Sequence, residues 1–479
     1  MCGIAGFISS KFVGAPRHIS ETLISMTSQL RHRGPDGQGV WVDDEHGVGL
    51  GHTRLSILDL SDTGRQPMSS SCGRMIVTFN GEIYNADQIR LELQKAGRSF
   101  KGSSDTEVLV EACAEFGFSK AVQKCIGMFA FALWDTQQNR LFLVRDRLGK
   151  KPLYFSHSGG ELVFGSELSA FQPFKPWERN IDRESLASFL VFGYVPDPRS
   201  IYDGISKLEP GHIATFDLYG ELSIQAYWSL DDFVFSGNNS SREARLSDAA
   251  AISKASALLT DSVESRLKAD VPVGIFLSGG LDSTIVAAIA SKNLGRARTH
   301  TFSIGFEEHA FNEADNARQI AGHLGTRHHE LYVSAKDALE CIPKLAHIYD
   351  EPFADSSQVP TYLLSKMARD NISVALSGDG GDEAFGGYNR YLMGEKIAWF
   401  NRLMPKSSRS VASNLMQAVD PELWDRLFGL LPKRLEVKNA GDKLHKLASV
   451  IPLDDIGVYR QLLSQWPDAY RSVPGAADP

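Results

Sequence analysis

The stretch Ser278–Ser283, SGGLDS, separates an apolar run from a helical run and decides the fold of the second half of the chain. The preceding run, Val271–Leu277, is rich in β-branched residues, which favours a buried parallel strand. A helical pattern opens at Ser283-Thr284, so the two glycines between the runs predict a tight turn at a helix N-terminus. Free backbone N–H groups there suit a phosphate, and the carboxylate of Asp282 suits Mg²⁺.

The same six residues also allow a simpler interpretation, a turn in which Asp282 or Ser283 caps the helix. The stretch is not a Walker loop, because no GxxxxGK[ST] pattern occurs and no Lys follows the glycines. It resembles the SGGxDS pyrophosphate loop of the ATP pyrophosphatases. That resemblance implies cleavage of ATP between its α and β phosphates.

From Ala249 onward, helical and strand patterns alternate, which predicts a doubly wound parallel sheet with helices on both faces. Ligands of such sheets bind beyond the carboxyl ends of the strands. Three loops are expected there: SGGLDS, Gly305–Glu313 and Ser377–Gly387. The last loop carries Asp379 and Asp382 among glycines, which suits Mg²⁺ and pyrophosphate, although a plain surface loop remains an alternative. Residues 388–479 read as an amphipathic helical extension.

The chain opens MCGIAGFIS, and removal of the methionine is expected to leave Cys2 at the N-terminus. A terminal Cys carries a thiol and an α-amine on one residue, so the amine can take the thiol proton without a histidine. The alternative for Cys2 is a small apolar residue in a strand.

Three further positions in the first half are candidates for binding or catalysis. Arg54 in GHTRLSI offers a guanidinium that suits an α-carboxylate, or else a surface ion pair. Asn80-Gly81 in NGEIYN signals either a hairpin turn or an oxyanion hole. Asp105 in SSDTEV either caps a helix or pairs with a substrate ammonium. Two predicted hairpins and helices near 86–97 and 104–117 favour a two-layer β-sandwich flanked by helices, an α+β fold.

Taken together and in order, Cys2, RHRGPDG, GHTRLSI, NGEIYN, SSDTEV and RDRLGKKPLY resemble the class II, N-terminal-nucleophile glutamine amidotransferases. The resemblance implies that Cys2 attacks the glutamine amide and that Asn80 and Gly81 stabilise the oxyanion. It also implies that glutamine is bound by Arg54, Asn80, Gly81, Glu82 and Asp105. The products would be glutamate and ammonia.

The second half resembles the synthetase domain of the glutamine-hydrolysing asparagine synthetases, which implies that ATP activates aspartate as an adenylate and ammonia then yields asparagine. Mg²⁺ would be held by Asp282 and Asp382, and Asp379 would act in adenylate formation and ammonia attack. The implied ATP-binding residues are Leu277, Ser278, Gly279, Gly280, Asp282, Ser283, Ile304, Ser377 and Gly378. Two rivals stay open: the same chemistry on another carboxylate, such as a surface-sugar uronate, and a catalytically silent regulatory or assembly protein.

The chain has 479 residues, 43% hydrophobic, with a net charge of −8 and no basic stripe, so nucleic acid is not an expected partner. No transmembrane run or signal-peptide pattern occurs. Five Cys without a CxxC pair predict neither a disulfide framework nor a zinc site and favour the cytoplasm.

The composition also suggests where the domains meet. We expect a glutaminase domain over residues 1–220, a linker over 221–248 that includes an Asn/Ser-rich run, and a synthetase domain over 249–479. The family resemblance implies a homodimer. It also implies a longer C-terminal region with a lysine near the phosphates, so a chain ending at residue 479 is expected to hydrolyse glutamine, to make asparagine poorly and to aggregate.

Overall fold

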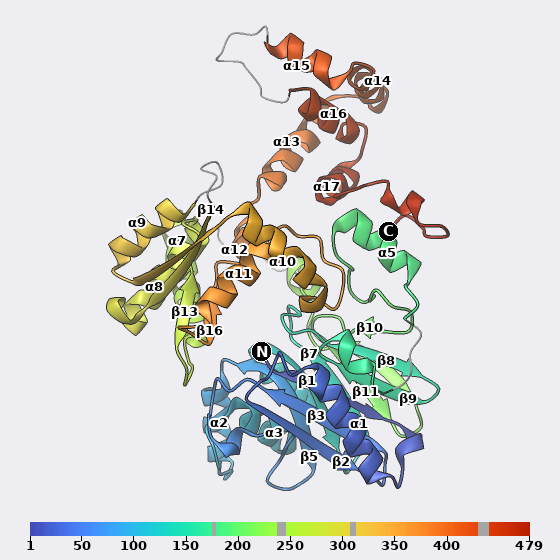
Figure 1. The fold of residues 1–479 in the computed structure, drawn as a ribbon, viewed down its shortest axis with the longest axis vertical. Coiled ribbons are helices and arrows are strands. Elements are labelled where there is room, and N and C mark those ends of the chain that lie inside the picture. Colours follow the sequence, from blue (N-terminus) through green and yellow to red (C-terminus); the bar gives the residue numbers. More distant parts are fainter. Residues whose placement is uncertain (175–178, 237–245, 307–312, 430–439) are drawn as a thin grey trace. The chain divides into compact units, whose positions relative to one another are not determined.

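The computed structural model describes residues 1–174, 179–236, 246–306, 313–429 and 440–479 (Figure 1). Two compact units are distinguished by their internal contacts. The first contains residues 1–186 and 195–378, and the second contains residues 187–194 and 379–479.

The first half of the chain forms two antiparallel sheets of six strands each. The first sheet has the order β10-β8-β9-β1-β3-β2, and the second has the order β12-β11-β7-β6-β5-β4. Their bounds are β1 Gly3–Ile8, β2 Gly37–Asp43, β3 Val48–Arg54, β4 Met68–Ser69, β5 Met75–Ile83, β6 Gly127–Asp135, β7 Arg140–Arg145, β8 Tyr154–Ser158, β9 Glu161–Gly165, β10 Ser206–Lys207, β11 His212–Asp217 and β12 Leu222–Ala226.

The two sheets pack face to face because alternate side chains of both turn inward. Ile4 and Leu50 from the first sheet share one buried cluster with Ile76, Trp134 and Leu143 from the second. Trp134 is fully buried in this cluster. Burial of large apolar side chains between two sheets supplies most of the driving force for this sandwich.

Helices cover the outer face of each sheet (Figure 1). Over the first sheet lies α1, where Gly49 leaves room for Leu23, since a Cβ on Gly49 would lie 2.9 Å from that side chain. Over the second sheet, Ile89 and Leu109 join Phe79 in a second buried cluster. The helices of this half are α1 Pro16–Gln29, α2 Ala86–Lys95, α3 Asp105–Phe116, α4 Phe118–Lys124 and α5 Arg183–Phe192. The predicted helices and both predicted hairpins, β6–β7 and β8–β9, are confirmed.

The second half contains the predicted parallel sheet, with the order β15-β14-β13-β16. Strands β14 and β15 lie on one side of β13 and β16 lies on the other, so the loop after β13 is at a topological switch point. The strands are β13 Val273–Phe276, β14 His300–Phe306, β15 Arg327–Val333 and β16 Val374–Leu376. The helices of this part are α7 Asp248–Arg266, α8 Leu281–Leu294, α9 Ala314–Leu324, α10 Ala335–Ile348 and α11 Gln358–Ala368.

Apolar clusters lie on both faces of the parallel sheet. On one face Ile275 packs with Ala287 of α8 and Ala317 of α9. On the other face Phe302 packs with Ala368 of α11. The α+β sandwich followed by a doubly wound α/β sheet is therefore confirmed as the fold class.

The segment 221–248, expected to be a linker, begins with β12, which pairs with β11 in the second sheet of the sandwich. It continues into α6 (Asp231–Ser236) and reaches the start of α7 at Asp248. The expected ligand loop Gly305–Glu313 lies mostly outside the described residues.

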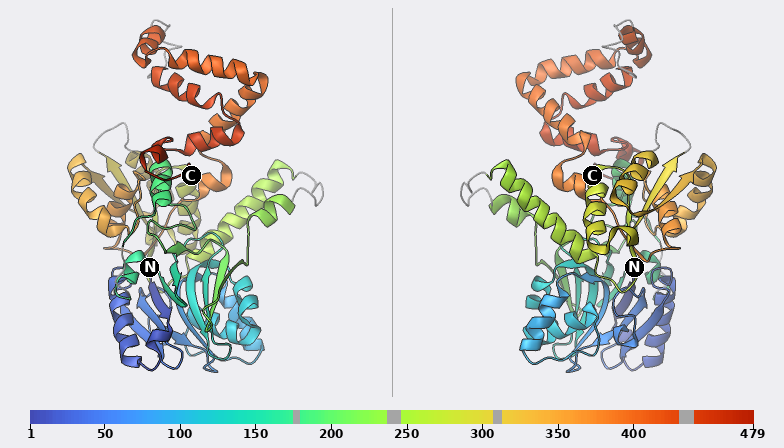
Figure 2. Two further views of the ribbon diagram at one scale, coloured as in Figure 1. Left: turned by 90° about the vertical axis from the view of Figure 1, so that its right-hand side faces the viewer. Right: turned by 90° about the vertical axis from the view of Figure 1, so that its left-hand side faces the viewer.

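The second unit is helical, as predicted for residues 388–479 (Figure 2, orange to red). Its interior includes Ile397, Val450 and Val458, which form one buried cluster. Its helices after residue 379 are α12 Gly381–Phe385, α13 Asn389–Leu403, α14 Lys406–Gln417, α15 Pro421–Gly429, α16 Ala440–Val450 and α17 Asp455–Leu463.

Candidate active site

A cavity of about 320 Å³ gathers all the residues predicted for a glutaminase site. They come from distant parts of the sequence, and the sandwich brings them together. Strand β1 pairs with β3 so that Gly3 faces Thr53, which carries Cys2 to the end of β3. The six predicted residues on the cavity wall are Cys2, Arg54, Asn80, Gly81, Glu82 and Asp105.

The thiol of Cys2 lies beside the backbone of Leu55. Its Sγ accepts a hydrogen bond from the Leu55 N–H at 3.4 Å and donates to the Leu55 carbonyl oxygen at 3.7 Å. Burial raises the pKa of the Cys2 thiol. Burial also lowers the pKa of the chain's terminal amine, on Met1 next to it, to about 6. An amine with this pKa is largely unprotonated at pH 7 and is available to accept a proton, whereas the raised pKa of the thiol opposes its ionisation in the absence of a ligand.

Asn80 and Gly81 lie inside strand β5, where they pair with Ala130 and Phe129 of β6. The hairpin-turn interpretation of Asn-Gly is therefore wrong. The Nδ2 of Asn80 is buried and has no hydrogen-bond partner among the described residues. A buried donor without a partner is costly, and this one lines the cavity, so it is free to bind an oxygen of a ligand.

Gly81 is required by the packing of β5 against β6. A Cβ atom there would lie 2.2 Å from the carbonyl oxygen of Met128. No side chain fits at that distance, so only glycine allows Asn80 and Glu82 to keep their places on the wall.

Two acids line the cavity, and burial is the first cause of both pKa shifts. The pKa of Glu82 is raised to about 7, and that of Asp105 is raised to about 6. Asp105 is not the helix cap: the Oγ of Ser104 caps α3 by accepting from the Glu107 N–H. The Asp105 carboxylate instead accepts a hydrogen bond from the Ile83 N–H at 2.9 Å. A buried acid held in this way can pair with an ammonium group of a ligand.

Arg54, at the end of β3, forms no ion pair within the described parts of the chain. Its guanidinium donates to the carbonyl oxygens of Ser61, at 2.9 Å, and Asp59. The surface-pair interpretation is therefore wrong. The two hydrogen bonds to carbonyl oxygens fix the orientation of the Arg54 guanidinium group. They leave its positive charge available to a carboxylate at the cavity.

Two cations next to Cys2, Arg33 and Lys151, were not predicted from the sequence. The Nε of Arg33 donates to the Cys2 carbonyl oxygen at 2.9 Å, and its Nη1 pairs with Glu167 at 2.6 Å. Lys151 lines the cavity and is only 5% exposed. Both lie in motifs that were recognised, RHRGPDG and RDRLGKKPLY. Nothing in those letters distinguishes the buried Lys151 from its exposed neighbour Lys150.

The SGGLDS loop has the predicted place between β13 and α8. The helix begins at Leu281, and its N-cap is Gly280, which offers no side-chain hydrogen bond. Capping by Asp282 or Ser283 is therefore wrong. The Oγ of Ser283 instead lies 3.0 Å from the Oγ of Ser278, across the turn. Asp282 lies in the first turn of α8.

Gly279 and Gly378 allow the loop to close. Gly279 has φ +83°, a conformation that favours glycine. A Cβ on Gly378, after β16, would lie 2.6 Å from the backbone N of Ser283. The structure therefore brings Ser377-Gly378 against the loop.

The other predicted nucleotide and metal residues are distributed as follows. Leu277 is buried in the cluster between β13, α8 and α9, and Ile304 lies on β14. Asp379 and Asp382 belong to the helical unit, and Asp382 lies on α12. No group of three or more His, Cys, Asp or Glu side chains with metal-binding geometry occurs among the described residues. A Mg²⁺ bound largely by phosphate oxygens and water needs only one or two carboxylates, and Asp282 fits that role.

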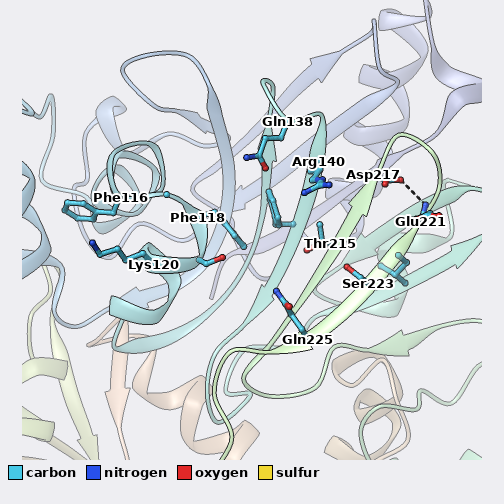
Figure 3. Close-up of a pocket in the computed structure, with 14 residues that line it drawn as sticks. Phe116, Phe118, Lys120, Gln138, Arg140, Thr215, Asp217, Glu221, Ser223 and Gln225 are labelled. Atoms are coloured by element: carbon cyan, nitrogen blue, oxygen red, sulfur yellow. Dashed lines mark hydrogen bonds between the residues drawn. The ribbon is translucent and has the colours of Figure 1, made fainter.

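A larger cavity of about 650 Å³ lies elsewhere, on the outer face of the second sheet beside α4 (Figure 3). Its wall includes Lys120, Arg140, Asp217 and Gln225, and none of the predicted site residues. The smaller cavity gathers Cys2 with the other predicted residues, so it is the better candidate for catalysis. In the described residues no helix is long and apolar enough to cross a membrane.

Comparisons with known proteins agree with both halves. The family described as glutamine amidotransferase domain matches residues 1–228, and the asparagine synthase family matches residues 254–474. A putative glutamine-hydrolysing asparagine synthetase 2 from Methanocaldococcus jannaschii is 37% identical over 87% of this chain and 81% of that protein. The glutamine-hydrolysing asparagine synthetase 1 of Bacillus subtilis is 34% identical over 84% of this chain.

The chain spans 61% of the length of the B. subtilis protein. It spans the same share of a putative asparagine synthetase from Mycobacterium tuberculosis, to which it is 36% identical over 82% of its own length. With two family domains in the same order and most of the M. jannaschii relative covered, the chain belongs to the family of glutamine-hydrolysing asparagine synthetases.

Proposed function

We propose that the protein makes asparagine from aspartate, glutamine, ATP and water, and releases glutamate, AMP and pyrophosphate. The observation that carries the proposal is the gathering of Cys2, Asn80, Arg54 and Asp105 around one cavity in a chain that also holds the SGGLDS loop. The names of the relatives support the same reaction.

In the glutaminase step, the α-amine of Cys2 takes the thiol proton once methionine has been removed. The thiolate attacks the side-chain amide carbon of glutamine, and the Asn80 side-chain amide and the Gly81 N–H stabilise the oxyanion. The proton passes from the amine to the departing nitrogen, so ammonia leaves and a thioester remains. Water then hydrolyses the thioester, which gives glutamate and restores the thiol.

Arg54 and the acids on the wall orient the substrate for this attack. The guanidinium of Arg54 would hold the α-carboxylate of glutamine. Asp105 and Glu82 would hold its α-ammonium, and a bound positive charge would favour their ionised forms. The substrate would thereby be fixed at the end opposite to its reacting amide.

In the synthetase step, the loop Ser278–Ser283 would bind the pyrophosphate part of ATP with its backbone amides. Mg²⁺, held by Asp282 and Asp382, would neutralise the phosphate oxygens. Leu277 and Ile304 would contact adenine, and Ser377 and Gly378 would contact the nucleotide. The aspartate carboxylate attacks the α-phosphorus and pyrophosphate leaves; Asp379 would act in this step and in the attack of ammonia, which displaces AMP.

The arrangement of the whole protein belongs to the same proposal. We assign the glutaminase to residues 1–220, a connecting segment to 221–248 and the synthetase to 249–479, and we expect a homodimer in the cytoplasm. All five cysteines are free thiols, which suits a reducing compartment.

A second candidate is the same amide transfer to a different carboxylate. One observation favours it: a protein named amidase chry2 from Gibberella zeae is 30% identical to this chain, over 82% of this chain and 60% of that protein. Assays that offer aspartate and other carboxylic acids separately, with amide formation measured by mass spectrometry, distinguish the two candidates.

The proposal is tested with the Cys2→Ala variant. Glutamate formation should be lost, whereas amide formation from added ammonium chloride should persist, because the synthetase step does not use the thiol. Glutamate production by Cys2→Ala at the wild-type rate would overturn the assignment of the nucleophile. A wild-type chain that forms neither glutamate nor asparagine would overturn the proposed function.

A further inference from the structure

Lys151 is a buried cation that forms no salt bridge with a carboxylate of the described residues. It is 5% exposed and lines the cavity of Cys2, and it forms no ion pair within the described parts of the chain. Its ammonium group donates a hydrogen bond to the Sδ of Met1 at 3.0 Å. Thioether sulfur is a weak acceptor, so the charge is poorly compensated. A charge kept in such a place needs an explanation, because burying an unpaired ammonium costs stability.

The neighbouring cation is different. Arg33 also contacts the start of the chain, through the Cys2 carbonyl oxygen, but its charge is paired with Glu167 at 2.6 Å. Arg33 therefore holds the backbone of Cys2 with its charge paired, whereas Lys151 lies at the same end of the chain without such an ion pair.

Removal of the methionine changes the surroundings of the Lys151 ammonium group. The Met1 thioether, which accepts a hydrogen bond from that ammonium group, leaves with that residue. The ammonium then faces the cavity beside the thiol and the new α-amine of Cys2. Two positive charges in the same buried cavity repel each other. The Lys151 ammonium therefore disfavours protonation of the Cys2 amine.

We propose that Lys151 is a positioning residue for the glutaminase, and that its positive charge keeps the α-amine of Cys2 unprotonated at neutral pH. The inference rests on the proposed function, since it assigns the base of that reaction. An unprotonated amine can take the thiol proton, which produces the thiolate and an ammonium on the same residue. The same positive charge stabilises the thiolate.

The three cations near the amine act on it in the same direction, whereas the Cys2 thiol acts in the opposite one. Lys151, Arg33 and Arg369 all lower the pKa of the amine at the chain's start, after burial as the first cause. Burial lowers the pKa of Lys151 itself, while nearby acids and the thiol raise it. The titratable or charged groups that face the amine or Lys151 are Cys2, Arg33, Glu82, Asp105, Asp146 and Arg369.

The test is the pH profile of kcat for glutamine hydrolysis at saturating glutamine, with removal of Met1 verified by mass spectrometry. In Lys151→Met the acidic limb should move upward by about 1 pH unit, as expected when a unit charge beside the amine is lost. Lys151→Arg should restore the wild-type limb. Lys150→Met removes the same charge from an exposed neighbour and should leave the limb in place.

The kcat profile separates this role from substrate binding. Glu82 and Asp105 act on glutamine binding, so their titration appears in KM, whereas the amine of the bound complex appears in kcat. A Lys151→Met variant with an unchanged limb and a uniformly lower kcat, or with a changed KM alone, would overturn the inference.

A second variant is used in case Lys151→Met does not fold. Lys151→Gln keeps a polar group in the cavity, and circular dichroism shows which variant is folded. Wild-type enzyme that hydrolyses glutamine while both variants keep its acidic limb refutes the role of Lys151 and leaves the proposed function intact. Wild-type enzyme without glutaminase activity refutes the proposed function itself.

Discussion

The carboxylate Oδ2 of Asp105 accepts a hydrogen bond from the backbone N–H of Ile83 at 2.9 Å, which ties the first residue of α3 to the end of β5. This bond holds an acid against the strand that carries Asn80 and Gly81. The position of the carboxylate proposed to bind substrate is thereby coupled to that of the donors proposed for the oxyanion.

Asp105→Asn should weaken glutamine binding with little change in fold. The amide oxygen can still accept from Ile83, but it cannot pair with an ammonium as a carboxylate does. A charged hydrogen bond of this kind corresponds to about a 10- to 100-fold increase in the KM for glutamine. Steady-state glutamate assays measure it. Asp87→Asn, an exposed acid on α2, is the matched control, and an equal increase in that variant would contradict the assignment.

The same residue predicts a pH dependence of stability in the absence of glutamine. Burial raises the pKa of Asp105 from 3.8 to about 6 in the folded chain, so the folded state favours the protonated form. The associated stability is present below pH 4 and is lost as pH rises through 6. Asp105→Asn should therefore be more stable than wild type by up to about 3 kcal/mol at pH 8, with no gain at pH 4. Denaturant titrations at both pH values measure it; a gain at pH 4 alone would contradict the sign.

Gly378→Ala should disable the nucleotide site selectively. The new Cβ would lie 2.6 Å from the Ser283 N, so the SGGLDS loop must shift. ATP-dependent pyrophosphate release should fall by at least about 10-fold, as when a positioned phosphate donor is displaced, while glutaminase activity remains. Gly322→Ala on α9 is the control, since nothing lies within 4 Å of its Cβ. Normal pyrophosphate release by Gly378→Ala would show that the loop does not bind the phosphates.

Asp282→Asn should remove metal-dependent ATP turnover without loss of fold. The side chain makes no capping bond to α8, so the helix does not depend on it. ³¹P NMR of the wild-type reaction should show AMP and pyrophosphate. The variant should require more Mg²⁺ for half-maximal turnover, because an amide is a weaker ligand than a carboxylate. ADP and phosphate as wild-type products would contradict the assigned bond cleavage.

Arg54→Lys should raise the KM for glutamine more than it lowers kcat. The guanidinium is oriented by the carbonyls of Ser61 and Asp59, and a single ammonium cannot make both contacts and bind a carboxylate with two parallel bonds. We expect about a 10-fold or larger increase in KM. Arg65→Lys, an exposed residue that pairs with Asp62, is the control. Equal kinetic parameters for Arg54→Lys and wild type would remove Arg54 from the binding site.

The sequence by itself determined the order and type of the elements that position both sites. Period-two patterns around Thr136–Asn139 predicted the β6–β7 hairpin, because side-chain alternation is a local property of strands. The strand, glycine turn and helix around Ser278–Ser283 were predicted for the same reason. The residues with chemistry to offer, from Cys2 to Asp105, could also be named from short motifs.

Only the tertiary structure decided which of the local alternatives holds. Asn80-Gly81 reads equally as a turn or as a site, and pairing with β6, almost 50 residues later, places it within a strand. Asp105 became a buried acid with a raised pKa, since burial depends on what packs against a residue. Likewise, Lys151 is buried whereas its neighbour Lys150 is exposed. Burial and long-range pairing are properties of the folded chain, so no motif encodes the charge field around Cys2.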